Sequence, residues 1–244
     1  MKEAFNAYRR SNFSAEFQRV GSNTSIRNIL FPEPGQLRSR KVVSRSSARP
    51  KGKYPSWKMK RMVHWESENE LNAFRLLDCD PNVTGFCEQP CRIMYVLDGR
   101  TRSHYPDILV EKKCAKELWE VKQEPEAEEQ EIATRTSLLA QQLPLWGYTY
   151  RVVLAKDLVM QPRLVNSRLL LGFGRRAITE REQEFIRRAL IRHGCLLWSD
   201  ACRGEYGPWG REILCGLVLR GVLTIDLNLA ISPGTRFVAR KENL

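Results

Sequence analysis

The chain has 244 residues, 42% of them hydrophobic, with 40 Lys and Arg against 28 Asp and Glu, and a pI near 9.6. This length suits one or two packed domains, and the basic excess favours polyanionic partners, nucleic acid first. The N-terminus lacks the apolar core of a signal peptide, and the longest apolar run, around residues 213–219, is too short to span a bilayer. We therefore expect a soluble cytoplasmic protein.

The positive charge is concentrated near the N-terminus. Residues 1–60 hold 14 Lys and Arg against 3 Asp and Glu, whereas the remaining 184 residues hold 26 against 25. Within this basic arm, residues 36–58 are rich in Ser, Arg, Lys and Pro and are typical of a linker. Aromatic residues are interleaved with the basic ones, among them Phe5, Tyr8, Phe13, Phe17, Tyr54 and Trp57. The arm is either a solvated tail or a segment that orders partly on DNA, with equal support for both.

Residues 61–174 are predicted to form an α/β domain. The expected elements are a helix at 67–79, strands at 83–88, 92–97, 103–111 and 117–122, a helix at 126–143, a strand at 148–155 and a helical connector at 163–173. A helix, mixed strands, a crossover helix and a parallel strand together indicate a mixed sheet flanked by helices.

Residues 175–244 are predicted to form a second, smaller domain. Thr179 and Glu182 have the spacing of a capping box, which would open a helix that extends to His193. The other expected elements are a helix at 209–220 and strands at 222–227 and 235–239. Helices followed by a short hairpin favour a winged-helix module.

The seven cysteines predict no zinc site. They are Cys79, Cys87, Cys91, Cys114, Cys195, Cys202 and Cys215, and no two have Cys-x-x-Cys spacing. Cys87 and Cys91 lack a second pair with zinc-ligand geometry. Free thiols of a reducing compartment are the better interpretation.

The most informative pattern is an acidic residue on one expected strand and an acid and a lysine on the next. Asp107 follows Pro106 at the start of an apolar stretch, and Glu120 and Lys122 are two residues apart. Because strand side chains alternate, Glu120 and Lys122 share a face, and a hairpin would place Asp107 beside Glu120. Two adjacent carboxylates repel unless a cation lies between them, and Mg²⁺ fits oxygen ligands best. The alternative is a surface hairpin whose charges face water.

A third acidic residue comes from the preceding helix. On a helical wheel of about 100° per residue, Glu70 lies between Phe74 and Leu77 on the apolar face. A carboxylate there needs a partner or a metal. Ser67 and Glu70 also have capping-box spacing, so Glu70 can fold back to the helix start. Its position on the wheel favours a metal ligand, but both roles can hold in part.

These motifs resemble the catalytic domain of the TnsA family of PD-(D/E)xK, restriction-endonuclease-like nucleases. The resemblance is carried by WESENELNAFRLLDCDPNVTGFCEQP, SHYPDILV and LWEVK. It covers residues 60–160 well and residues 175–244 more loosely. It implies that Glu70, Asp107, Glu120 and Lys122 are catalytic, with the three acids as metal ligands. It also implies a structural role for the Gln-Pro pair at 89–90.

One departure from the family leaves the third ligand open. The family's usual Ser-Leu-Leu-Glu is Ser-Glu-Asn-Glu here, so Glu66 or Glu68 could replace Glu70. His104 is expected to be a solvent-facing strand residue, although it could touch phosphate.

The resemblance implies a Mg²⁺-dependent endonuclease, with Mn²⁺ as an alternative, that acts in transposition. It would hydrolyse the 5′ ends of a transposon, on the non-transferred strand, beside a DDE transposase of TnsB type. An AAA+ ATPase of TnsC type would bind residues 175–244. The competing hypotheses are a stand-alone restriction-type endonuclease or junction resolvase, and a non-catalytic DNA-binding adaptor. Clustered acids near DNA weigh against the adaptor, because they would repel phosphate.

Overall fold

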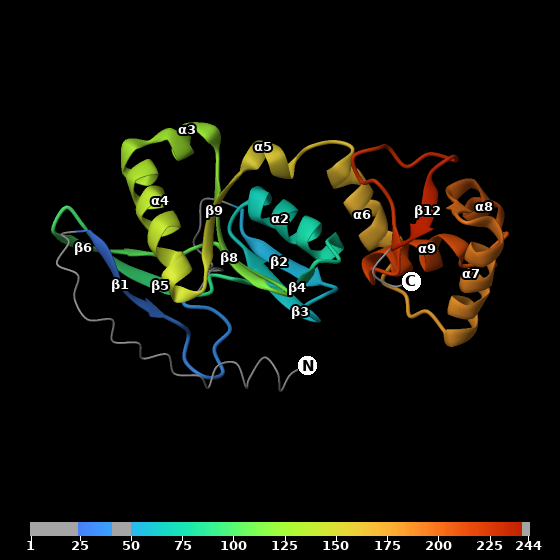
Figure 1. The fold of residues 1–244 in the computed structure, drawn as a ribbon, viewed down its shortest axis with the longest axis horizontal. Helices are drawn as coiled ribbons and strands as arrows, with labels where there is room; N and C mark the ends of the chain where they lie inside the picture. The colour runs from blue at the N-terminus through green and yellow to red at the C-terminus, as the bar shows by residue number, and fades with distance from the viewer. Residues whose placement is uncertain (1–23, 41–49, 241–244) are drawn as a thin grey trace.

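A computed structural model of the chain describes residues 24–40 and 50–240 (Figure 1). Its strands are β1 (Ser25–Leu30), β2 (Gly52–Ser56), β3 (Arg61–Trp65), β4 (Val83–Glu88), β5 (Arg92–Leu97), β6 (Arg100–His104), β7 (Ile108–Lys112), β8 (Ala115–Lys122), β9 (Thr149–Leu154), β10 (Leu196–Leu197), β11 (Leu223–Thr224) and β12 (Arg236–Ala239). Its helices are α2 (Glu68–Cys79), α3 (Glu124–Glu128), α4 (Gln130–Gln142), the 3₁₀ helix η2 (Leu143–Trp146), α5 (Ala155–Leu158), α6 (Arg163–Phe173), α7 (Glu180–His193), α8 (Trp198–Arg203) and α9 (Gly210–Leu219). Among the described helices, none is long and apolar enough to cross a membrane.

The main sheet has the strand order β4-β7-β8-β9. Strands β4, β7 and β8 pair antiparallel, and β9 joins β8 in parallel after the crossover through α3 and α4. A second sheet, β1-β5-β6, is antiparallel, and β2 and β3 form a separate pair. The parallel β8–β9 pair with its helical crossover confirms the predicted mixed α/β architecture.

Helices cover the main sheet on both faces (Figure 1). Phe74 of α2 and Ile108 of β7 are completely buried in one core cluster. Leu139 of α4 and Leu118 of β8 are completely buried in another. The alternation of side chains along β7 and β8 therefore supplies an apolar surface to each helix.

Several predicted boundaries hold and two are wrong. The helix expected at 67–79 and the connector expected at 163–173 correspond to α2 and α6. The strand expected at 103–111 is two strands, because Pro106, which has no N–H to donate, lies in the break between β6 and β7. The helix expected at 126–143 is also broken, since Glu129 has extended backbone angles between α3 and α4.

The region predicted to be arm and linker contributes two strands to the fold, which corrects that prediction. β1 pairs with β5, and β2, inside the expected linker, pairs with β3. The Tyr54 side chain is buried in the core beneath α2, and Trp57 packs against the core of the C-terminal unit, so neither is a free aromatic for DNA. Phe5, Tyr8, Phe13 and Phe17 lie outside the described residues.

The C-terminal unit has the predicted order of helices and hairpin, with two further elements. Thr179 caps α7, where its hydroxyl accepts a hydrogen bond from the Glu182 N–H at 3.3 Å. β11 and β12 pair antiparallel as expected, but β11 covers only Leu223–Thr224 of the strand expected at 222–227, which corrects that prediction. β10, which the sequence did not reveal, pairs with the other side of β12. α8 is also additional. Whether this unit is a winged helix stays a prediction.

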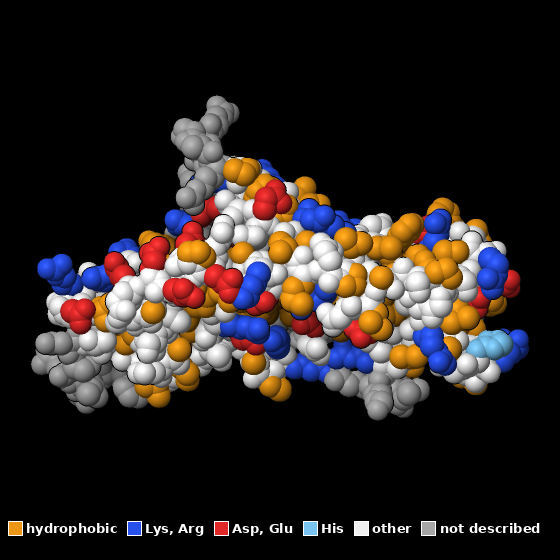
Figure 2. All heavy atoms as spheres, turned by 90° about the horizontal axis from the view of Figure 1, so that it is seen from above, with side chains coloured by type: hydrophobic (Ala, Val, Ile, Leu, Met, Phe, Trp, Pro, Cys, Tyr) orange, Lys and Arg blue, Asp and Glu red, His pale blue; other side chains and the backbone are white. Residues whose placement is uncertain are grey.

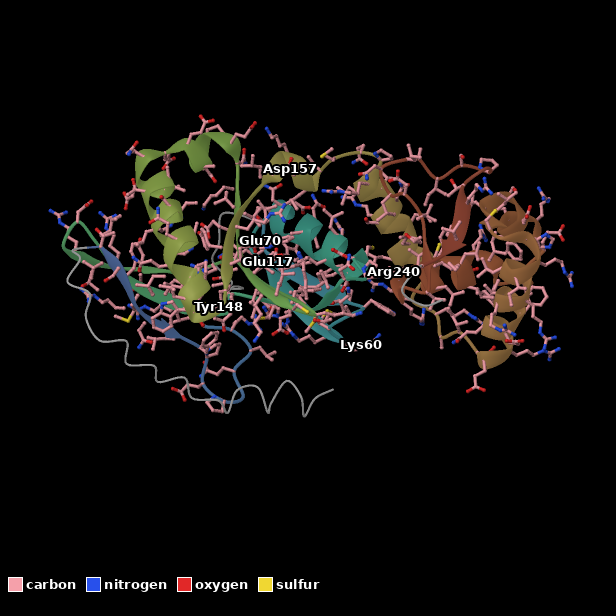
Figure 3. All side chains as sticks on the ribbon, viewed as in Figure 1. Lys60, Glu70, Glu117, Tyr148, Asp157 and Arg240 are labelled. Atoms are coloured by element: carbon pink, nitrogen blue, oxygen red, sulfur yellow. The ribbon has the colours of Figure 1, made fainter. Side chains whose placement is uncertain are left out.

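The two units share a packed junction. Leu170 of α6 and Cys79 of α2 belong to the same buried cluster as Leu214 of α9. Arg240 donates a hydrogen bond to the Asn82 Oδ1 at 2.5 Å, and it lies between the units in Figure 3. All seven cysteines are free thiols, as predicted, and Cys79 is buried in this junction.

Asp78 is a buried carboxylate that ties β2 and the following turn to α2. It accepts hydrogen bonds from the Tyr54 hydroxyl and the Ser56 hydroxyl, both at 2.7 Å. It also accepts from the backbone N–H groups of Trp57 and Lys58, at 2.9 and 3.1 Å. Four donors satisfy one carboxylate, which makes its burial tolerable.

We expect Asp78→Ala to lower the free energy of unfolding by roughly 3–5 kcal/mol, because it leaves several buried donors without an acceptor. Urea denaturation of the full chain measures this. Asp157→Ala, which removes an exposed carboxylate on α5, should change stability by less than about 0.5 kcal/mol. Equal stability of the two variants would contradict the structural role of Asp78.

Candidate active site

The antiparallel pairing of β7 with β8 places Asp107 opposite Glu120. Ile108 pairs with Trp119, so the residue before Ile108 faces the residue after Trp119. The Asp107 N–H donates to the Trp119 carbonyl at 2.9 Å, and the Asp107 Oδ2 accepts from the Val121 N–H at 2.8 Å. The predicted hairpin is therefore confirmed.

Gln89 fixes the backbone of Asp107 from the other side. The Gln89 N–H donates to the Asp107 carbonyl at 2.8 Å, and the Gln89 side chain is completely buried. Gln89 has φ 46°, a left-handed conformation that residues other than glycine rarely adopt. Its Oε1 accepts from Arg40 Nε at 2.9 Å. The Gln-Pro pair singled out in the sequence thus supports the site rather than lining it.

Glu120 is a buried carboxylate surrounded by basic groups. The Lys122 Nζ, on the same face of β8, lies 3.2 Å from its Oε1, and the Arg135 Nη2 of α4 lies 3.3 Å from the same atom. The His104 Nε2 of β6 lies 3.1 Å from Oε2. Although burial raises the pKa of Glu120, the neighbouring His104, Lys122 and Arg135 bring it below its usual value.

His104, Arg135 and Tyr150 are residues of this site that the sequence did not identify. His104 was expected to face solvent, but its side chain is only 7% exposed, which corrects that prediction. The Tyr150 hydroxyl lies 3.1 Å from its Nε2. One continuous strand across 103–111 would have put His104 and Asp107 on opposite faces, and the break at Pro106 removes that constraint.

Glu70 folds back to the start of α2, as one of its two predicted roles requires, but its carboxylate accepts from the N–H of Glu66 and not from that of the N-cap residue Ser67. Its Oε2 accepts from the Glu66 N–H at 2.9 Å, and its Oε1 from the Ser67 hydroxyl at 3.2 Å. The Ser67 Oγ in turn accepts from the Glu70 N–H, which caps α2. Burial raises the pKa of Glu70 to about 6, against the lowering effect of the Glu66 N–H. Figure 3 shows Glu70 near the middle of the nuclease unit.

The two alternatives to Glu70 are placed differently. Glu66 forms ion pairs with Arg40 and Lys51, at 2.5 and 3.0 Å, so its charge is already balanced. Glu68 is an exposed residue in the first turn of α2.

Asp107 is an acid of this cluster whose pKa is raised by both burial and neighbouring carboxylates. Burial, and then the negative charges of Glu120 and Glu70, raise the pKa of Asp107 well above its usual range. Across the described residues, no three acidic, histidine or cysteine side chains are arranged to hold one ion together. The carboxylates still fit a hard divalent cation by their chemistry, because all their donors are oxygens and their mutual repulsion calls for positive charge.

A mixed α/β sheet with an acid pair and a lysine at the end of a hairpin is consistent with a nuclease. Residues 80–154 match the family model for the TnsA-like endonuclease N-terminal domain, a range that includes Asp107, Glu120 and Lys122 but not Glu70. The chain therefore carries a TnsA-like endonuclease domain, and its resemblance to the TnsA family is confirmed. A search of curated proteins found no match to the chain.

Asp107→Asn should stabilise the protein at neutral pH when divalent cations are removed. A raised pKa in the folded state means that folding favours the protonated carboxyl. That contribution is complete below the unfolded Asp pKa of about 3.9 and is lost as pH rises through the raised pKa. Asn cannot ionise, so the variant should melt higher at pH 7, by roughly 2–4 °C per kcal/mol gained.

The difference in melting temperature between Asp107→Asn and the wild type should shrink toward pH 4. Calorimetry in EDTA measures it. Asp157→Asn, on the exposed surface of α5, should show no such pH dependence. An Asp107→Asn variant that melts below the wild type at neutral pH would contradict the inference that ionisation of Asp107 opposes folding.

Proposed function

We propose that the protein is the strand-cleaving endonuclease of a Tn7-like transposase. It hydrolyses phosphodiester bonds at the 5′ ends of the transposon, on the non-transferred strand, beside a DDE transposase of TnsB type and an AAA+ regulator of TnsC type. The observation that carries the proposal is the pairing of Asp107 with Glu120, with Lys122 on the same face, inside the TnsA-like endonuclease domain.

Asp107 and Glu120, with Glu70 as the third acid, would hold Mg²⁺, for which Mn²⁺ can substitute. Such an ion lowers the pKa of bound water and stabilises charge on the phosphate. The Lys122 ammonium, 3.2 Å from Glu120, is placed to donate to a phosphate oxygen or orient the attacking water. His104 and Arg135 act as positioning residues, because they bind the Glu120 carboxylate from two other elements.

The two acids have different electrostatic environments, and this favours catalysis over a structural role. Three basic neighbours lower the pKa of Glu120 against the effect of its burial, whereas burial, and then the charges of Glu120 and Glu70, raise the pKa of Asp107. Divergent pKa values in adjacent carboxyls are typical of acid–base sites. A non-catalytic adaptor would gain nothing from this repulsion next to DNA.

Asp107→Ala should abolish metal-dependent cleavage of transposon-end DNA, measured with the partner transposase present. DNA affinity should not fall, because the substitution removes a negative charge that repels phosphate. The matched control, Asp157→Ala, should cleave like the wild type. Cleavage by Asp107→Ala at the wild-type rate would overturn the assignment of the site.

The same assay decides the role of Glu70. Gln can keep the hydrogen bonds that cap α2 but lacks the charge that a metal requires. Cleavage by Glu70→Gln should therefore fall far more than its melting temperature. Near-normal cleavage with a lowered melting temperature would show that Glu70 serves only as a cap.

For the C-terminal unit, we propose a winged helix that docks mainly to the ATPase. Residues 175–244 hold 12 Arg and Lys against 8 Asp and Glu, a mild bias for a DNA-reading domain. The helix before the hairpin, α9, would be the DNA-reading helix of such a module. Eight of its residues are buried against α6, α8 and the hairpin, among them Ile213 and Leu214, which leaves little surface for a DNA groove.

A fragment of residues 160–244 should bind the ATPase in a pull-down and bind duplex DNA weakly. The fragment begins at 160 because α6 contributes Leu170 and Leu171 to this core. Circular dichroism checks that it is folded. Firm binding of duplex DNA without binding of the ATPase would contradict the docking assignment.

A further inference from the structure

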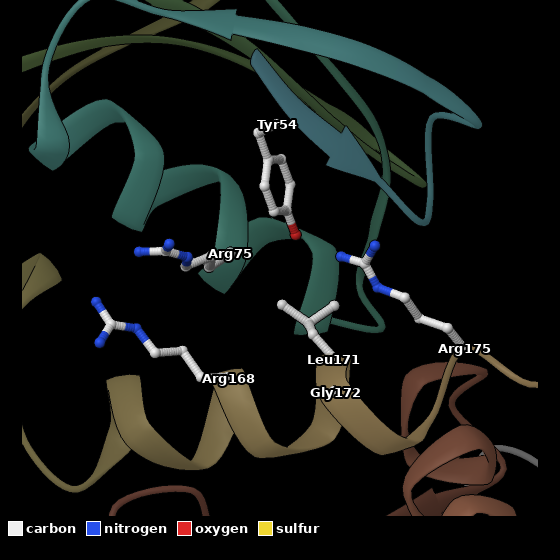
Figure 4. Close-up of a pocket in the computed structure, with 6 residues that line it drawn as sticks. All are labelled: Tyr54, Arg75, Arg168, Leu171, Gly172 and Arg175. Carbon is white, nitrogen blue, oxygen red and sulfur yellow. The ribbon is translucent and has the colours of Figure 1, made fainter. Parts of the chain in front are cut away.

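A cavity of about 340 Å³ lies between α2 and α6 at the junction of the two units (Figure 4). Three arginines line it: Arg75 from α2, Arg168 from α6 and Arg175 just after α6. In Figure 4, Arg75 and Arg168 extend toward the same side, and the Arg175 guanidinium lies near the Tyr54 hydroxyl. The remaining lining residues are Tyr54, Leu171 and Gly172.

None of these three arginines forms an ion pair with a carboxylate of the described residues. Arg75 Nη1 and Arg168 Nη2 both donate to the single neutral acceptor Asn72 Oδ1, at 2.8 and 3.4 Å. Arg175 lies over the Tyr54 ring at 5.9 Å. By contrast, Arg61, Arg135 and Arg176 are each paired with a glutamate.

The arginines of the cavity repel one another. Burial, and then the charge of Arg168, lower the pKa of Arg75, while Glu68 acts on it only at a distance. Arg75 and Arg168 meet at one neutral acceptor and face solvent at the mouth of the cavity, whereas Arg175 lies on the far side of Tyr54 (Figure 4). Two neighbouring guanidinium groups without a carboxylate partner can bind an anion, and their planar donors match phosphate. On the face seen in Figure 2, further Lys and Arg side chains gather near the middle of the molecule.

We propose that Arg75 and Arg168 bind a backbone phosphate of the DNA substrate, in a contact separate from the carboxylate site. The assignment rests on the proposed function, which makes DNA the substrate. Arg75 follows Glu70 by five residues on α2, so the two are about 7.5 Å apart along the helix axis. The same five residues turn Arg75 by about 140° around the helix axis from Glu70. The arginine contact therefore lies on another side of α2 than the carboxylates and would hold a phosphate away from the bond that is cleaved.

The contact gives the junction a role in substrate positioning. A phosphate bound between α2 and α6 touches a helix of the nuclease unit and a helix that packs in the C-terminal core. Phosphate contacts fix register and orientation without reading sequence. The arginine cavity therefore sets where the duplex lies relative to Asp107 and Glu120.

The test measures DNA binding by the full chain in EDTA, where no cleavage occurs, against salt concentration. The probe is a duplex of roughly 30 base pairs, about three helical turns. For the double variant Arg75→Gln/Arg168→Gln, the slope of log affinity against log salt should become shallower by about 1, as for one lost phosphate contact. The matched control is Arg187→Gln/Arg188→Gln, which removes equal charge from residues paired with Glu184 on α7 and should keep the wild-type slope.

A second variant separates charge from folding. Arg75→Lys/Arg168→Lys keeps both charges and should restore the wild-type slope. If its slope is as shallow as that of the Gln variant, the effect is structural and the inference fails.

The remaining outcomes are also distinct. An unchanged slope in the Gln variant, with normal binding by the wild type, overturns the cavity assignment but leaves the proposed function intact. A wild-type protein that does not bind the duplex overturns both. Calorimetry with inorganic phosphate tests the other possible ligand, a small phosphate compound. If the Gln variant loses phosphate binding while its DNA slope is unchanged, the cavity binds a small phosphate ligand and not DNA.

Discussion

The fold brings the carboxylates of Asp107 and Glu120 together where β7 pairs with β8. Several elements around this pair supply groups that reduce the cost of placing two buried acids side by side. The register that pairs Ile108 with Trp119 forces Asp107 and Glu120 to face each other. Three elements then supply positive or hydrogen-bonding groups to Glu120, and the Gln89 N–H fixes the backbone of Asp107. For Asp107, burial and the negative charges of Glu120 and Glu70 raise the pKa, so a nearby cation would favour its ionised form.

Helix α2 links this cluster to the rest of the molecule. Its first turn carries Glu70, Arg75 follows in the middle, Asp78 anchors β2 near its end, and Cys79 enters the core shared with the C-terminal unit. A shift of α2 would therefore change the carboxylates, the arginine cavity and the unit junction together. This explains why a short helix concentrates so many polar contacts in otherwise apolar surroundings.

The sequence predicted the parts of the site that depend on local spacing. Alternation along one strand put Glu120 and Lys122 on one face, and the short loop predicted the hairpin that adds Asp107. It could not predict His104 or Arg135, because their positions depend on which strand and helix meet β8 across the fold. The strands in the arm were missed for the same reason: β1 and β2 are short and are stabilised by pairing with β5 and β3. In β1 a register shift between Ile26 and Asn28 also interrupts the alternation of apolar residues.

The junction has a consequence for how a docked partner would act. α6 contributes Leu170 to the C-terminal core and packs on α2, and Arg220 of the C-terminal unit lies over the Trp57 ring of the nuclease unit at 5.4 Å. Separating the units would expose these buried groups to water, which opposes free swivelling. A protein bound to the C-terminal unit therefore meets a nuclease of fixed orientation. Under the proposed docking, recruitment would therefore orient the carboxylate cluster directly, without a flexible linker between the two units.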